Sequence, residues 1–465
     1  MNFIKKHLVF SLIILQIMIC ILTIIFFDGT ADSGDSIVHY LFARYAPAHP
    51  KLFFDHWAKP LFVILASPFA QFGFGGIKVF NAINSVITII YTYKVTELLK
   101  IKNPVIVIIL MMFAPLNYIL TFSGLTEPLF AMFLILGIYF CLKEKYVTAS
   151  LIISFLPYVR SEGLIIIGIF GLYFMLIKKW KSIPFLITGS AVISIAGYFV
   201  YHDLLWVFTK IPYATLNSVY GSGTITHFAE KLVYVVGVPI CVLVWIGFST
   251  LVIKLFRKKA NTEEFLFLLS SFSLFLIAHS LFWYLGIFNS YGLIRVMISI
   301  MPVMAIIALM GFNALTESFI KTEKIGIIIK VIVLGYILIF PFAPHPAAIQ
   351  WEEKMMLQGG QLRAMEVADF ISKNNQAKYP IIYSHPALSM ALNLDPFDEN
   401  KVRKFTRENI SGMRSGELLI WDNVFVEFES GIKKSDLDAM PELTQIFLYK
   451  TEKGPEVVYS GYMRK

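Results

Sequence analysis

Charged residues and cysteines are scarce in this chain, and each shortage excludes a class of protein. Only 15% of the 465 residues are Asp, Glu, Lys or Arg, whereas a soluble domain carries about 25%. The mean hydropathy is +0.70, so most of the chain is solvated by lipid and not by water. All three cysteines lie inside apolar runs, which argues against a disulfide framework: Cys20, Cys141 and Cys241.

The sequence also lacks the short motifs of nucleotide-dependent and zinc-dependent enzymes. GxxxxGK(S/T), GxGxxG after a strand, HExxH and paired CxxC are all absent. These absences argue against a nucleoside-triphosphate enzyme and against a standard zinc site.

The basic charge is confined to one part of the chain. Residues 1–344 contain 25 Lys and Arg against 14 Asp and Glu, whereas residues 345–465 contain 15 against 17. The excess of basic residues therefore belongs to the hydrophobic part of the chain, where it sets the orientation of the protein in the membrane. It does not indicate a nucleic-acid partner.

Long apolar runs, separated by short Lys-rich breaks, extend from Leu8 to Ala343. A bilayer requires about 20 apolar residues per helical crossing, so the sequence predicts an all-α polytopic membrane protein. The apolar segment Leu61–Phe72 is too short to cross and is predicted to lie along the interface or to re-enter. Eleven crossings are predicted, at residues 8–27, 77–97, 104–121, 125–142, 147–159, 163–178, 183–203, 231–255, 264–286, 291–312 and 325–343.

Lysines in the short loops predict the orientation of these crossings. The clusters fall in alternate loops, and they share a side with Lys5 and Lys6 only if the segment 61–72 does not cross. Because such clusters stay cytoplasmic, we expect a cytoplasmic N-terminus and an extracytoplasmic C-terminus, in the bacterial inner (plasma) membrane. The clusters are Lys100 with Lys102, Lys143 with Lys145, Lys178 to Lys181, Lys254 to Lys259, and Lys321 with Lys324.

Two domains are predicted: a transmembrane catalytic domain, residues 1–344, and a small soluble α/β domain, residues 345–465. In the second domain a helical pattern at Gln361–Lys373 is followed by short strand patterns. The strands are predicted at Pro380–Tyr383, Leu418–Trp421 and Thr444–Tyr449. A further outer loop, rich in Tyr, Ser and Gly, is predicted at residues 203–230.

The first outer loop, residues 28–76, is much longer than a link between two helices needs. If Ser36–Ala43 is helical, Asp35 and His39 share a face at i and i+4. Asp32 or Asp35 then stands near a helix N-terminus, where capping is the alternative to a catalytic role. Long titratable loops on rigid scaffolds are common functional sites. The titratable residues of this loop include Asp28, Asp32, Asp35, His39, His49, Asp55 and His56.

Three basic residues are predicted at the same outer face: Lys59, Arg160 and Arg295. Ionisable groups at membrane depth are costly and are functional candidates by default, although snorkelling or pairing with an acid such as Glu162 would also explain them. Glu127, at the start of a predicted span, is equally explained as a favourable helix-start charge. Cations beneath an acidic loop suit a lipid-phosphate substrate, because a carboxylate activates a nucleophile and cations hold a phosphate.

The order of these features resembles the GT-C superfamily of membrane glycosyltransferases over residues 1–345. The resemblance rests on the acidic loop with Asp35, the sequence Lys59-Pro60-Leu61, the span FNAINSVITIIYTYKVTELL, and the motifs at Thr126–Phe130, Arg160–Gly163 and Gly292–Arg295. It implies a polyprenyl-phosphate-linked sugar donor, as in mannosyl- and aminoarabinose transferases, and a glycan, lipid or protein acceptor. It also implies that Asp35 is the general base on the acceptor hydroxyl, that Asp32 or Asp55 is a second acid, and that the anomeric configuration inverts.

The acids of the loop depart from the family pattern, which often has two adjacent acids or Asp-x-Asp. Asp32 and Asp35 are three residues apart, and His39 stands where an aromatic residue is expected. Metal use therefore stays open, with Mg²⁺ as the candidate cation for an oxygen-rich site.

Two other functions compete with this interpretation. A lipid-linked sugar transporter or flippase is expected to have broken helices in corresponding positions of two halves and charges near mid-membrane, whereas the charges here stand at span ends. A glycan polymerase or ligase would use the same donor, and its key basic residues are expected in a large late loop.

Overall fold

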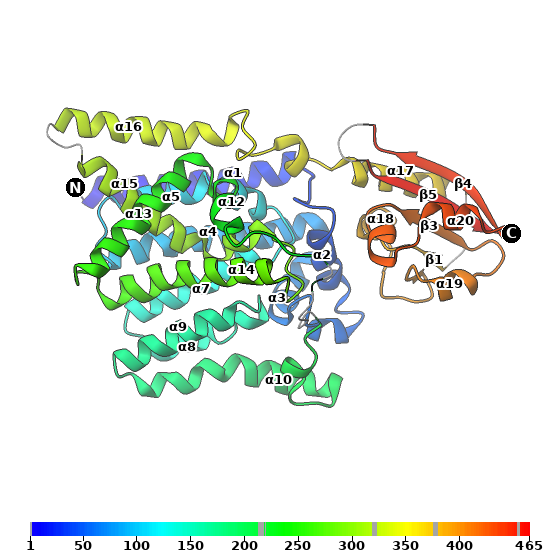
Figure 1. The fold of residues 1–465 in the computed structure, drawn as a ribbon, viewed down its shortest axis with the longest axis horizontal. Coiled ribbons are helices and arrows are strands. Elements are labelled where there is room, and N and C mark those ends of the chain that lie inside the picture. The colour runs from blue at the N-terminus through cyan, green and yellow to red at the C-terminus, as the bar shows by residue number, and fades with distance from the viewer. Residues whose placement is uncertain (1, 213–217, 219, 319–322, 375–379, 453–455) are drawn as a thin grey trace.

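The computed structural model describes residues 2–212, 218, 220–318, 323–374, 380–452 and 456–465. They form a long bundle of helices and a C-terminal region, residues 345–465, which holds a small sheet at one end of the bundle (Figure 1). The N-terminus lies at the opposite end. The predicted loop 203–230 and the predicted lysine cluster at Lys321 fall partly outside the described residues.

Seven of the described helical segments are long and apolar enough to cross a membrane, and the chain is therefore an integral membrane protein. They are α1 (Asn2–Phe26), α4 (Phe74–Leu98), η3 (Trp180–Ile187) with α10 (Thr188–Tyr201), α13 (Val238–Phe256), η4 (Glu264–Ser270) with α14 (Ser271–Leu285), η5 (Ile294–Ile300) with α15 (Met301–Ser318), and α16 (Glu323–Ile339) with η6 (Phe340–Phe342). Three other predicted spans are shorter apolar helices: α7 (Glu127–Leu142), α8 (Tyr146–Ile153) with η2 (Leu156–Tyr158), and α9 (Gly163–Leu176).

Proline and glycine divide two of the predicted spans. The span predicted at 104–121 consists of α5 (Ile106–Met112) and α6 (Pro115–Thr121), because Pro115 lacks an N–H group and holds Ala114 in an extended conformation. The beginning of the span predicted at 231–255 belongs to α12 (His227–Val236), which Gly237, at φ +80°, separates from α13. Neither span is one uninterrupted helix, and the count of eleven crossings stays a prediction.

The helices α13 and α15 approach each other at two glycines. A Cβ atom on Gly247 would overlap the carbonyl oxygen of Ile307, and one on Gly311 would overlap that of Leu243. Small residues allow membrane helices to pack backbone against backbone in this way. Because α15 follows directly on η5, which carries Arg295, this crossing fixes the segment that reaches the candidate site described below.

We expect Gly247→Ala to lower the stability of the protein by about 1–3 kcal/mol, because the added methyl group must push two helix backbones apart. The readout is the unfolding temperature of the purified protein in detergent. Gly168→Ala on α9 is the matched control, since its Cβ would meet nothing within 4 Å and alanine favours a helix. Equal unfolding temperatures for the two variants would contradict the close crossing.

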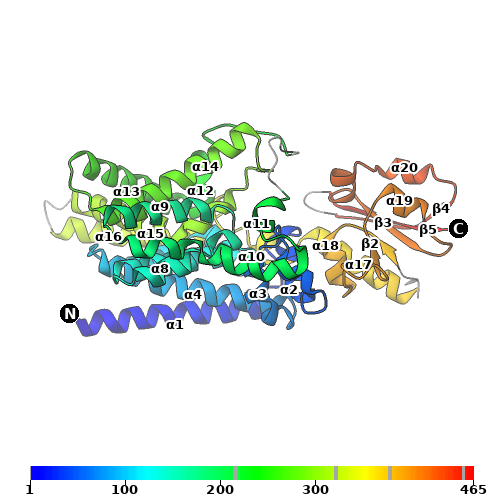
Figure 2. The ribbon, with the colours of Figure 1, turned by 90° about the horizontal axis from the view of Figure 1, so that it is seen from below.

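The first outer loop folds into short helices beside the C-terminal region (Figure 2): α2 (Asp35–Tyr45), η1 (Pro50–Phe54) and α3 (Pro60–Ala70). The 11-residue α3 packs against α2 and α4 and is too short to cross. Lysines of the predicted cytoplasmic loops lie at the far end of α4 and α15, where Lys5 pairs with Glu97 at 2.7 Å and Lys102 with Glu317 at 2.8 Å. The acidic loop and these lysines thus occupy opposite ends of the bundle, and the side that faces the cytoplasm stays a prediction.

The C-terminal region contains a five-stranded sheet of order β2-β1-β3-β5-β4. β1 is parallel to β2 and β3, whereas β5 is antiparallel to β3 and β4. The strands are β1 (Ile381–Ile382), β2 (Val402–Arg403), β3 (Leu418–Asp422), β4 (Leu443–Lys450) and β5 (Val458–Arg464). The helices are α17 (Gly359–Lys373), α18 (Pro386–Ala391), α19 (Arg407–Ser411) and α20 (Lys434–Asp438), with η7 (Trp351–Met355) and η8 (Val426–Ser430). The predicted helix and three predicted strands agree with α17, β1, β3 and β4, whereas β2 and β5 were not predicted.

Candidate functional site

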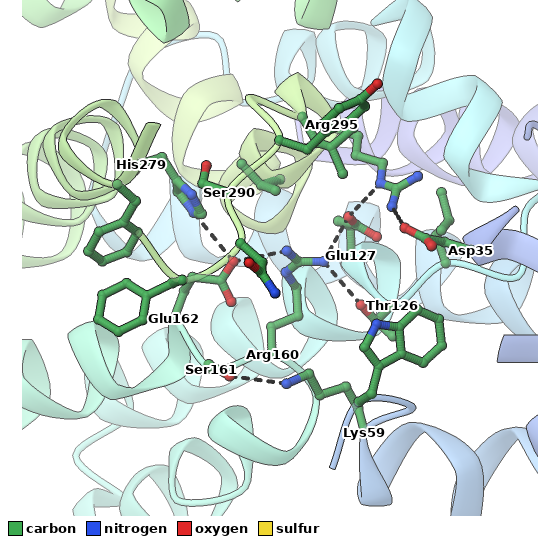
Figure 3. Close-up of a pocket in the computed structure, with 18 of the residues that line it drawn as sticks. Asp35, Lys59, Thr126, Glu127, Arg160, Ser161, Glu162, His279, Ser290 and Arg295 are labelled. Atoms are coloured by element: carbon green, nitrogen blue, oxygen red, sulfur yellow. Dashed lines mark hydrogen bonds and ion pairs between the residues drawn. The ribbon is translucent and has the colours of Figure 1, made fainter. Parts of the chain in front are cut away.

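A cavity of about 450 Å³ lies between the first outer loop and the adjacent ends of the later helices (Figure 3). Its walls come from α2, the segment before α3, the N-termini of α7 and α9, α12, α14 and the segment that precedes α15. The charged and polar side chains that line it are Asp35, His39, Lys59, Thr126, Glu127, Arg160, Ser161, Glu162, His279, Asn289, Ser290 and Arg295. Seven predicted site residues, His39 among them, are separated by up to 260 positions in the sequence and still line this cavity together.

Arg295 joins the later helices to the first outer loop. Its guanidinium group donates to Asp32 Oδ2 at 2.8 Å and to the carboxylate of Asp35. Asp32 Oδ1 accepts the N–H groups of Gly34 and Ser36, at 2.9 and 3.0 Å, so Asp32 caps the beginning of α2. Burial raises the pKa of Asp32, although Arg295 opposes the shift. Asp35, the first residue of α2, is 41% exposed and lines the cavity.

The predicted helix at 36–43 is part of α2, and Asp35 and His39 both line the cavity from it. Asp32 is not among the described residues of the cavity wall. The two acids are thus separated by position: Asp32 supports the helix start, and Asp35 faces the space in which a ligand would lie.

Glu127 is fully buried at the N-terminus of α7, and its Oε1 atom connects two arginines. Arg160 donates to that oxygen at 2.8 Å, and Nε of Arg295 lies 3.6 Å from it. Arg160 also donates to Thr126 Oγ1 at 3.2 Å and to Glu162 at 2.9 Å. The second oxygen of Glu127 has no hydrogen-bond partner among the described residues. A buried carboxylate with a free oxygen is costly, so this atom is available to a ligand in the cavity.

Lys59 extends the positive charge to the other side of the cavity. It is the residue before Pro60 at the start of α3, with φ at +70°, and Nζ donates to Ser161 Oγ at 3.0 Å. Burial lowers the pKa of Lys59 to about 7, although Glu162 opposes the shift. Lys59 therefore changes charge near neutral pH, and a phosphate beside it would favour the charged form.

Two histidines form part of the apolar wall. His39 stacks on Trp57 with ring centroids 4.7 Å apart, and burial lowers its pKa to about 3, so the ring is neutral. Its Nδ1 atom has no partner among the described residues. His279 lies 3.4 Å from Glu162. Sequence reasoning missed His279, Trp57 and Ser161. His279 is a lone histidine in an apolar stretch, whereas Trp57 and Ser161 stand among charged or titratable residues that gave the stronger signal.

Two predicted residues of the first outer loop do not reach the cavity wall. Asp55 accepts the N–H group of Ala58 at 2.8 Å and so caps the turn after η1. Nε2 of His56 lies 2.8 Å from the carbonyl oxygen of Val207. Asp55 and His56 therefore have local structural contacts, and this geometry offers no support for Asp55 as the second acid.

The acids in and beside the cavity do not fit Mg²⁺, the candidate cation for an oxygen-rich site. Among the described residues, no three His, Cys, Asp or Glu side chains lie together in a way that could hold a metal ion. Asp32, Asp35, Glu127 and Glu162 instead each contact an arginine. A carboxylate that is already neutralised by a guanidinium group is a poor ligand for a hard cation, and we derive no catalytic step from a metal.

Comparison with known proteins identifies the fold. No family model and no curated protein matches the sequence. Among solved structures, that of ArnT from Cupriavidus metallidurans bound to undecaprenyl phosphate aligns with a TM-score of 0.63 at 10% sequence identity, over 96% of this chain and 97% of that one. The chain has an ArnT-like fold.

The ArnT-like fold includes both parts of the molecule, because an alignment over 96% of the chain must extend into the C-terminal region. The low sequence identity means that the likeness lies in the backbone and not in matched side chains.

Proposed function

We propose that this protein is a membrane glycosyltransferase of the GT-C type, which moves a sugar from a polyprenyl-phosphate carrier to an acceptor hydroxyl at the outer membrane face. The observation that carries the proposal is the cavity, into which the Asp35 carboxylate and three cationic side chains open together (Figure 3): Lys59, Arg160 and Arg295. The ArnT-like fold supports it, since the matched ArnT structure holds undecaprenyl phosphate, which is a polyprenyl phosphate.

In the proposed reaction, Asp35 accepts the proton of the acceptor hydroxyl while that oxygen bonds to the anomeric carbon of the donor sugar. The bond from the anomeric carbon to the phosphate oxygen breaks, and its electron pair leaves with the polyprenyl phosphate. Attack from the face opposite the leaving group inverts the anomeric configuration. A positioned base contributes about 10²–10⁴-fold to such a reaction.

The cations stabilise the phosphate that departs, because they are already held in place before its charge develops. Glu127 keeps Arg160 and Arg295 at the wall of the cavity, and Ser161 orients Lys59. The lipid tail keeps the donor at the membrane, which is why the base and the cations must lie at an outer helix end and not in mid-bilayer. A flippase would need no carboxylate that faces the anomeric carbon.

The test is to incubate the purified protein in liposomes with a panel of polyprenyl-phosphate sugars and with glycan, lipid and peptide acceptors. Release of the free carrier phosphate together with a new acceptor product supports the proposal. Movement of the labelled donor across the bilayer without sugar release would favour the flippase, and growth of a repeating glycan would favour the polymerase. Absence of carrier release with every donor would overturn the proposal.

Lys59 predicts a pH dependence of donor use. Because its pKa is about 7, kcat/KM for the donor should fall by about tenfold between pH 6 and pH 8 as the free enzyme loses this charge. Arginine keeps its charge over that range, so Lys59→Arg should remove this part of the pH profile. An unchanged profile in Lys59→Arg would assign the dependence to another group.

A further inference from the structure

The C-terminal region lies directly against the segment that leads into the aspartates of α2. The N–H group of Gly29 donates to the carbonyl oxygen of Met355 at 2.8 Å, and that of Leu357 donates to Asp28 Oδ1 at 3.1 Å. A Cβ atom on Gly29 would stand 2.5 Å from the carbonyl carbon of Met355, so the two backbones touch without side chains between them.

A buried hydrogen-bond chain continues from this contact toward the site. Nε2 of Gln361, on α17, donates to Thr30 Oγ1 at 2.6 Å, and the Thr30 hydroxyl donates to the main-chain oxygen of Asp32 at 2.5 Å. Oε1 of Gln361 accepts the N–H group of Gln358 at 2.8 Å, which fixes the side of the amide that faces Thr30. Gln361 and Thr30 are each only 2% exposed.

The hydrogen-bond chain ends at Asp32, which holds the proposed base, Asp35, through Arg295. Asp32 caps α2 through one oxygen and binds Arg295 through the other, and Arg295 also binds Asp35. A shift of the Asp32 backbone therefore moves the first turn of α2 and the guanidinium group together. Both of these contacts determine where the Asp35 carboxylate points.

The same region also holds the other end of α2. Arg44 donates to Asn393 Oδ1 at 3.1 Å, and Nε2 of His49 lies 2.7 Å from Asp395 Oδ2. Phe397 packs edge-on against Phe42 with ring centroids 4.8 Å apart. Contacts at both ends restrain the position of α2 along and around its axis.

We infer that the C-terminal region positions the catalytic aspartate, and that Gln361 is the positioning residue of this device. The inference rests on the proposed function, in which Asp35 must stand within reach of the acceptor proton. A misplacement of about 1 Å costs on the order of 10²-fold in rate. Gln361→Ala should therefore lower kcat by about 10- to 100-fold, while KM for the donor should change much less, because Lys59 and Arg160 are not part of the hydrogen-bond chain and only Arg295 is.

The experiment compares full-length Gln361→Ala with Gln445→Ala in steady-state transfer assays. Gln445 is the matched control, since it is a glutamine of the same region that donates to a hydroxyl, Ser460 Oγ at 3.0 Å. Thr30→Val, which removes the hydroxyl, should reproduce the loss of kcat, and Thr30→Ser should restore it. The double variant of Gln361→Ala and Thr30→Val should lose no more of its kcat than either single variant does, because both changes break the same hydrogen bond.

Hydrogen exchange supplies a readout that does not depend on transfer. In Gln361→Ala the amides of residues 29–40 should exchange faster than in the parent protein, and in Gln445→Ala they should not. Equal exchange and equal kcat in Gln361→Ala and Gln445→Ala would overturn the inference while the proposed function stands. Faster exchange in Gln361→Ala, together with a parent protein that transfers no sugar, would instead overturn the proposed function and leave the restraint on α2 supported.

Discussion

Asp35→Asn is expected to lower sugar transfer by about 10²–10⁴-fold, which is the contribution of a positioned general base. Asparagine keeps the shape of the side chain and an oxygen for Arg295, but it cannot accept the proton of the acceptor. Binding of the donor should stay near normal, because asparagine keeps an oxygen for Arg295 and the other two cations, Lys59 and Arg160, do not contact Asp35. The measurements are kcat for transfer and equilibrium binding of a labelled polyprenyl phosphate, in the same membrane preparation.

Asp55→Asn is the control for this variant, and it also tests the predicted second acid. Asp55 comes from the same loop, and asparagine retains an oxygen for the N–H group of Ala58. Its kcat should lie within about twofold of the parent value, since Asp55 does not line the cavity and asparagine caps a turn about as well as aspartate. Full activity in Asp35→Asn would remove Asp35 from the mechanism, and a loss in Asp55→Asn would return Asp55 to it.

The membrane bundle and part of the site were accessible from local sequence patterns. Apolar runs of bilayer length located the seven helical segments that are long enough to cross, and the i, i+4 spacing of Asp35 and His39 placed both side chains on one face of α2. Arg160 and Arg295 were identified because charge at membrane depth is rare. Each of these signals lies within a window of about 20 residues.

The features that sequence could not provide depend on contacts between distant segments. Gln361 and Thr30 are 331 residues apart, and each is an ordinary polar residue in its own surroundings. Glu127 fits a helix start equally well, and only the fold shows that its carboxylate connects two arginines. Asp55 illustrates the converse, since a local cap and a catalytic acid can be the same residue type in the same loop, and the sequence does not distinguish them.

Arg295→Ala is expected to destabilise the protein by about 3 kcal/mol, the lower end of the range for breaking a buried ion pair. Its loss leaves Asp32, Asp35 and Glu127 near one another with fewer compensating charges. The expected loss of stability is at the lower end of that range because solvent screens the charge of Asp35, whose side chain is 41% exposed. The measurement is the unfolding temperature in detergent. Lys5→Ala is the control, since its exposed pair with Glu97 is worth only about 0–1 kcal/mol.

The loss of stability in Arg295→Ala should also depend on pH. Burial raises the pKa of Asp32, and in the parent protein Arg295 opposes that shift. Without Arg295 the Asp32 carboxyl group is harder to ionise in the folded state than in the unfolded state, so the folded state binds more protons and stability falls as pH rises. Lowering the pH from 8 to 5 should therefore narrow the difference in unfolding temperature between Arg295→Ala and the parent protein. Arg295→Lys keeps the charge but not the two-pronged geometry, and it should be intermediate in stability. A gap that widens in acid would show that Arg295 does not act by neutralising these carboxylates.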